Sequence, residues 1–258
     1  MSTGQSRLIA LGVMLWVLGS VLPGGYARAA SRPSVALVSA GARIGIVNLL
    51  DAEVTHFHAA RKVQDGFLKT YAVNWLVSAM LAEAVRERLT QLNLVAVPLP
   101  PGEALSRARE DCFLNANLEK SLAKECAAAY SALSASQHLA ALIVLGPGLN
   151  DSTHAGSTRR KDLPEYLRGW CVLTDERTAV PVLLNLTELL LIGTDPKGAA
   201  LLAAREWGGS ESGAWEGFSA PADLKAFSQA QLNQLQPLYA TLLKVQAAAL
   251  MAHLEVAR

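Results

Sequence analysis

The chain contains 258 residues, of which 51% are hydrophobic and 17% are charged. This low charged fraction excludes a disordered, solvating chain as the main design, and the length is ample for a buried core. The 23 lysines and arginines nearly balance the 22 acidic residues, so the net charge is +1 and no nucleic-acid partner is indicated.

The N-terminus has the pattern of a cleaved export signal. Arg7 supplies a short positive region, residues 8–22 are uncharged and mostly apolar, and Ala27-Arg28-Ala29 fits the small-x-small cleavage rule. A retained anchor is the alternative, but the apolar stretch spans only about 22 Å as a helix, short of a ~30 Å hydrocarbon core. We therefore expect residues 1–29 to be a signal peptide. The mature protein is expected to be periplasmic or secreted, with no transmembrane span.

The first third of the mature chain predicts a β-α-β order. Residues 35–50 predict one strand, or two strands separated by Gly41, and residues 51–72 predict a further strand or hairpin. Apolar residues recur at helical spacing over residues 73–92, and residues 94–99 predict a short strand.

The middle of the chain predicts helices followed by strands. Helices are expected over residues 102–110 and 115–137, and the apolar run 139–145 is typical of a strand buried on both faces. Residues 166–174, 180–192 and 199–207 predict three more strands. We expect the last two to form an antiparallel hairpin around a Pro/Gly turn, although a helix over residues 195–206 is the competing interpretation.

The C-terminal stretch, residues 222–256, is expected to be helical, in two pieces that meet at Pro237. An apolar stripe should pack on the domain or on a partner, with Gln246 away from its centre. The stripe consists of Leu238, Leu242, Val245, Ala249 and Ala252. The predicted fold is therefore α/β with a mixed sheet, a single domain over residues 30–221 with a helical segment at 222–258.

The three cysteines predict one disulfide and one buried thiol. Cys112 and Cys126 are near each other in sequence, and an oxidising compartment favours a bridge between them. Cys171 lies in an alternating run typical of a buried strand, and no neighbouring base indicates an activated thiolate.

Two groups of residues are candidates for a site. His56 and His58 would share one face of a strand and could hold a metal ion, if a third ligand comes from elsewhere. The polar loop over residues 146–161 follows a buried strand, where α/β sheets tend to bind ligands. Its candidate ligand-binding residues are Asn150, Asp151, His154, Arg159 and Arg160.

The segment Arg43–His58 (RIGIVNLLDAEVTHFH) resembles a group of exported proteobacterial proteins to which no activity is assigned. The order of elements is also similar, at the level of fold, to small α/β domains of envelope proteins such as the curli-secretion lipoprotein type and the N-terminal domain of TolB. A similarity at the level of fold assigns no functional residue. The leading hypothesis is a non-catalytic periplasmic binding or assembly module, which would present a sheet edge or the C-terminal helix to another envelope protein. The alternative is a small periplasmic metal-binding protein or hydrolase that uses His56, His58 and the loop. The sequence identifies no cofactor.

Overall fold

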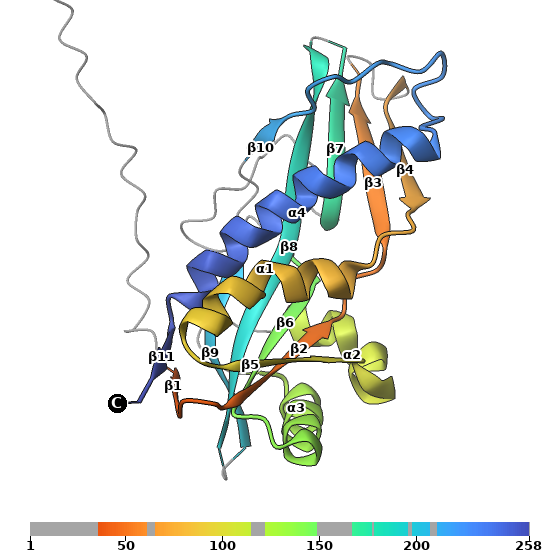
Figure 1. Ribbon diagram of the computed structural model, residues 1–258. Helices are drawn as coiled ribbons and strands as arrows, with labels where there is room; N and C mark the ends of the chain where they lie inside the picture. The colour runs from red at the N-terminus through yellow and green to blue at the C-terminus, as the bar shows by residue number, and fades with distance from the viewer. Residues whose placement is uncertain are drawn as a thin grey trace, which may run out of the picture. The chain divides into compact units, whose positions relative to one another are not determined.

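One long strand, β8 (Thr178–Asp195), runs through the main sheet in the computed structural model (Figure 1). The structure describes residues 36–60, 65–114, 122–148, 167–176, 178–195, 198–206 and 211–257, which belong to one compact unit, Ser31–Arg258. The other strands are β1 (Ala36–Val38), β2 (Arg43–Asn48), β3 (Glu53–Ala59), β4 (Phe67–Ala72), β5 (Val95–Leu99), β6 (Ala141–Pro147), β7 (Gly169–Asp175), β9 (Gly198–Glu206), β10 (Glu211–Ala214) and β11 (Leu254–Val256). The helices are α1 (Val77–Gln91), α2 (Gly102–Leu114), α3 (Lys124–Gln137) and α4 (Gln229–Met251).

The pairing along β8 divides the main sheet into two halves. β7 pairs with the first part of β8, ending at the partners Gly169 and Leu186, and β6 pairs with the second part, beginning at Pro147 and Thr187. β2 and β5 extend the sheet beyond β6 with parallel pairing, whereas β3 and then β4 extend it beyond β7. β9 and β10 pair with β8 as well, β9 in the second part and β10 in the first. We call one half the helix-covered half; it consists of β5, β2, β6, β9 and the second part of β8. We call the other the hairpin half; it consists of β4, β3, β7, β10 and the first part of β8.

Helices cover both faces of the helix-covered half. Leu189 and Leu191 of β8 pack in the same core as α1 and α4, which cross in front of the sheet in Figure 1. Leu190 and Ile192 point to the opposite face, because side chains alternate along a strand, and pack with residues of α2 and α3. β6 is buried along its whole length, which confirms the prediction of a strand buried on both faces.

The predicted α/β fold is confirmed in its main features. The chain opens with β-α-β order, Gly41 separates β1 from β2, and β3 and β4 form an antiparallel hairpin. The competing helix over residues 195–206 is not formed, because β9 pairs antiparallel with β8. Cys112 and Cys126 form a disulfide between α2 and α3, and Cys171 is a buried free thiol, as expected.

The C-terminal helix differs from the prediction in its continuity. The two-piece helix is wrong, because α4 continues through Pro237. A proline removes the hydrogen bond to the carbonyl four residues earlier, here that of Asn233. Both residues are exposed, so water can bind that carbonyl while the buried side of the helix remains intact. Ser228 begins the helix with a capping box in which Gln231 participates.

The buried face of α4 is also rotated relative to the predicted stripe. Val245 is 50% exposed, whereas Gln246, expected to lie away from the stripe, is fully buried. The amide Nε2 of Gln246 donates to the backbone oxygen of Thr187 at 2.8 Å, and the Thr187 hydroxyl donates to Gln246 Oε1 at 3.1 Å. A polar partner on β8 therefore allows a polar residue to occupy the centre of the buried face.

The last residues of the chain do not continue the helix. β11 follows α4 and pairs in parallel with β1, with Ala36 opposite Leu254. This two-stranded pairing joins the beginning of the described chain to its end. The prediction that the chain stays helical to residue 256 is therefore wrong for residues 254–256.

Candidate ligand-binding site

His56 and His58 lie side by side on β3, on the face of the sheet that α4 covers. Both imidazoles are buried, and both contact the Thr174 hydroxyl of the neighbouring strand β7, His56 through Nε2 at 2.7 Å and His58 through Nδ1 at 2.8 Å. A hydroxyl has a single proton, so it donates to one ring and accepts an N–H from the other when both imidazoles are neutral. The shared face expected from the strand spacing is confirmed.

Aromatic rings surround this histidine pair. The His56 ring stacks on Phe227 with centroids 4.4 Å apart and meets Phe67 edge-on at 4.9 Å. The pKa of His56 is lowered from 6.5 to about 4, mainly by burial and next by the neighbouring His58, while a hydrogen bond with the backbone of Leu224 acts in the opposite direction. The His56 imidazole is therefore neutral in the folded protein at neutral pH.

Nothing in the described part of the chain completes a metal site around the two histidines. Across the ranges given above, no three His, Cys, Asp or Glu side chains gather where they could share a metal ion. The third ligand that the metal hypothesis requires is not found there. That hypothesis stays a prediction.

The predicted loop residues Asn150, Asp151, His154, Arg159 and Arg160 lie outside the described residues, which stop at Gly148 and resume at Leu167. The two flanks of this segment can be located. Pro147 at the end of β6 and Arg168 just before β7 both line one pocket.

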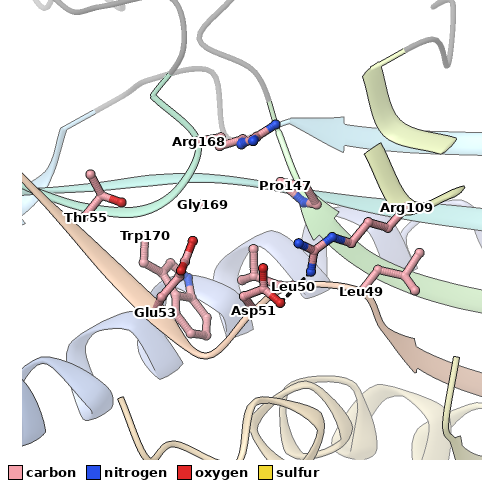
Figure 2. Close-up of a pocket in the computed structure, with 10 residues that line it drawn as sticks. All are labelled: Leu49, Leu50, Asp51, Glu53, Thr55, Arg109, Pro147, Arg168, Gly169 and Trp170. Atoms are coloured by element: carbon pink, nitrogen blue, oxygen red, sulfur yellow. Dashed lines mark hydrogen bonds and ion pairs between the residues drawn. The ribbon is translucent and has the colours of Figure 1, made fainter. Parts of the chain in front are cut away.

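This pocket lies where the two halves of the sheet meet, and we call it the junction pocket (Figure 2). It has a volume of about 280 Å3. It is lined by Leu49, Leu50, Asp51, Glu53, Thr55, Arg109, Pro147, Arg168, Gly169 and Trp170. The parallel strands β2 and β6 end here and β3 and β7 begin, so the pocket lies at carboxyl ends of parallel strands, a preferred place for ligands in α/β sheets.

Local backbone features shape the pocket. The Asn48 side chain closes a turn after β2, because its Oδ1 accepts a hydrogen bond from the Leu50 N–H at 3.0 Å. That turn leads directly into Asp51. On the other side, Gly169 has a φ of +72°, a left-handed conformation that favours glycine, and this allows the chain to turn into β7 beside Leu50.

Charged side chains of both signs surround the junction pocket. Figure 2 shows Asp51 beside Arg109, which donates from Nη1 to Asp51 Oδ1, with Glu53 next to them and Arg168 on another side of the pocket. Arg109 comes from α2, one turn before the disulfide-bonded Cys112. Among the described residues, Glu53 has no ion-pair or hydrogen-bond partner for its carboxylate.

The histidine pair and the junction pocket lie on opposite faces of β3. Val54, His56 and His58 face the core under α4, so Glu53 and Thr55 face the other side of the sheet. The structure therefore does not bring the predicted histidines into the pocket. Sequence reasoning missed its four charged residues, although charged residues at the ends of predicted strands are a signal that can be read from the sequence.

Comparisons with known proteins gave no match to a family model and no match to a curated protein. Within the described residues, no helix has the length and apolar character needed to span a membrane.

Proposed function

We propose that the protein is a non-catalytic binding module of the cell envelope that takes a small ligand in the junction pocket. The observation that carries this proposal is the pocket itself, which places four charged side chains from β3, α2 and the segments before β3 and β7 around one volume. Pockets that bind ligands commonly combine a preformed concave shape with a few placed polar groups.

The fold also favours the pocket over two protein-docking surfaces. The apolar side of α4 is already buried in the core, so it is not available to a partner protein. At the edge strand β5, the Val95 N–H donates to the Ala42 backbone oxygen on the side of β2. Backbone groups alternate in direction along a strand, so the backbone nitrogen of Pro98 lies on the open side of the edge. Proline has no N–H to donate, which makes this edge unsuitable for adding a partner strand.

Export supports the assignment to the envelope. The apolar stretch and the Ala27-Arg28-Ala29 sequence are typical of a signal peptide, although residues 1–35 lie outside the described residues. The Cys112–Cys126 disulfide suits an oxidising compartment. N-terminal sequencing of protein recovered from the periplasm should begin at Ala30, whereas an intact N-terminus in a membrane fraction would contradict export.

Binding in the pocket can be tested with Thr55→Trp, which fills the pocket from β3. Native mass spectrometry of protein purified without denaturation should detect a bound small molecule on the wild type and not on the variant. Glu255→Gln, an exposed change on β11, is the matched control and should retain the ligand. Equal ligand on Thr55→Trp, or none on the wild type, would contradict the proposal, provided that circular dichroism shows the variant folded.

A further inference from the structure

We propose that residues 215–227, between β10 and α4, form a strap that opens in mild acid when the buried His56 takes up a proton, while the rest of the domain stays folded. We call this segment the aromatic strap, because all of its residues are described and only the rings of Trp215 and Phe227 are buried. In Figure 1 it leads from β10 to the start of α4. The inference is independent of the junction pocket, which lies on the opposite face of β3.

The aromatic strap is held to the sheet mainly at its two ends, and it contains no helix or strand. At one end, the Trp215 N–H donates to the backbone oxygen of Pro181 at 2.9 Å. At the other end, the Phe227 ring stacks on His56 and on Tyr71, with centroids 4.4 Å and 5.4 Å away. A segment with few buried contacts opens at a lower free energy than the core, so the closed strap depends on the contact between Phe227 and His56.

The groups that face His56 are neutral or positively charged. Its own strand presents His58, and β7 presents the Thr174 hydroxyl that both histidines contact. β4 and the strap add a tyrosine and two lysines, whose ammonium groups lie over aromatic rings of the same cluster: Tyr71, Lys69 and Lys225. The backbone of Leu224 favours the charged ring, but it carries no net charge. None of these groups is an anion that would offset a positive charge on His56.

The carboxylates of the surrounding elements do not supply this anion. Asp223 of the strap is exposed, and its Oδ1 accepts a hydrogen bond from the Lys225 N–H at 2.8 Å. The remaining charged residues of β3, β7, the strap and α4 lie on the opposite face of their strand or are exposed: Glu53, Asp175, Glu216 and Lys244. A proton on His56 therefore places an unbalanced charge in an apolar site, which is unfavourable while the strap is closed.

The size of the response follows from His56 alone. Its pKa is about 4 in the closed form, whereas an exposed histidine has the ordinary value of 6.5. Opening of the strap exposes the ring, so acid favours the open form between these two values. From pH 7 to pH 5, the ratio of open to closed strap should rise by about twentyfold.

The test is amide hydrogen exchange of the purified protein, measured by NMR at pH 7 and pH 5 and corrected for the intrinsic exchange rate. The Trp215 N–H reports on the strap, because its hydrogen bond to Pro181 breaks on opening. We expect its protection factor to fall by about twentyfold at pH 5. Low urea should leave this exchange unchanged, because a local opening exposes little surface, and the amides of α1 and β6 should remain better protected at both pH values.

Three variants sharpen the test. His56→Phe keeps a stacked ring without a titrating group, so Trp215 should be equally protected at both pH values. The matched control is His138→Asn, which replaces an exposed histidine in a left-handed conformation that asparagine tolerates, and it should keep the wild-type response. Phe227→Ala removes the anchoring ring and should lower the protection of Trp215 already at pH 7, a result that does not depend on the folding of His56→Phe.

Several outcomes would overturn the proposal. Equal or higher protection of Trp215 at pH 5 in the wild type would show that the aromatic rings hold the charged imidazole in place by cation–π attraction. A common protection factor and urea dependence for Trp215, α1 and β6 would show that acid unfolds the whole domain instead. A pH response that persists in His56→Phe would exclude His56 as its cause, and unchanged protection in Phe227→Ala would exclude this ring as the anchor.

Discussion

The two halves of the sheet share β8 but bury different kinds of residue. In the helix-covered half, β6 and residues 189–192 of β8 bury consecutive aliphatic residues, because helices lie on both faces. The buried polar residues Thr187 and Glu188 lie at the start of this part of β8, opposite the end of β6. In the hairpin half, the face towards α4 buries His56, His58, Thr174 and Asn185 among aromatic rings. Aliphatic burial stabilises a fold without geometric requirements, whereas each buried polar group needs a partner in the right place. We therefore expect the aliphatic core of the helix-covered half to be less sensitive to pH than the histidine-containing face of the hairpin half, and the junction pocket forms where the two halves meet.

The largest effect is expected from removing the element that covers both halves. Deleting residues 237–258 removes most of α4, including the fully buried Tyr239, Leu243 and Leu250. Each large apolar side chain contributes about 1.5–3 kcal/mol when buried, so losing several of them costs as much as the about 5–15 kcal/mol by which domains are stable. We expect no cooperative thermal unfolding transition in calorimetry. A truncated protein that melts near the wild-type temperature would show that α4 is dispensable to both halves.

The hairpin half should respond to acid through His56. Its pKa of about 4 in the folded protein lies below the unfolded value of 6.5, so between these pH values only the unfolded chain binds the proton. Stability is therefore full above pH 6.5 and falls as the pH is lowered, by about 3 kcal/mol when it reaches 4. Urea unfolding at several pH values measures this slope.

His56→Phe is the control for the acid response, because it keeps an aromatic ring between Phe67 and Phe227 without a titrating group. The variant should lose stability less steeply than the wild type between pH 6.5 and 4. Identical slopes would assign the acid response to other groups.

The helix-covered half should respond to loss of its disulfide. The Cys112–Cys126 bridge closes a loop with a sequence separation of 14, for which the chain-entropy model gives about 3 kcal/mol. The double variant Cys112→Ser/Cys126→Ser should unfold at lower urea and become insensitive to reductant. The NMR signals of His56 and His58 should not move, because the bridge lies in the other half. Shifted histidine signals would show that the two halves are more tightly coupled than their packing indicates.

The smallest effects distinguish two adjacent positions on α4. Gln246→Ala removes the amide donor to the buried Thr187 backbone oxygen, while the Thr187 hydroxyl keeps Asn185 Oδ1 as a partner, and should cost about 1–3 kcal/mol. Val245→Ala changes a half-exposed side chain and should stay within about 0.5 kcal/mol. Chemical denaturation of both variants measures the difference. A larger loss of stability for Val245→Ala than for Gln246→Ala would support the buried stripe that the sequence pattern predicted.

Most elements could be predicted from the sequence because their signals are local. The helix α1 followed from apolar residues at helical spacing, and β6 followed from an uninterrupted apolar run. The prediction for α4 was less accurate. The sequence shows that Pro237 leaves a backbone carbonyl without its hydrogen bond, but it does not show whether that carbonyl is exposed to water, and therefore whether the helix can continue. The short strands β10 and β11 escaped prediction, since strands of this length exist only through the partner that pairs with them.

The candidate site shows the limit of sequence reasoning more sharply. The shared face of His56 and His58 could be predicted from the chain alone, because alternation along a strand is a local property. The disulfide could be predicted as well, since both cysteines lie near each other in the chain. That the histidine face points into the core, and that Glu53 and Thr55 line a pocket, follows from the tertiary packing and not from the local pattern. The physical reason is that Arg109, Arg168 and Asp51 are far apart in sequence, and only the pairing of β3 with β7 and the packing of α2 bring them together.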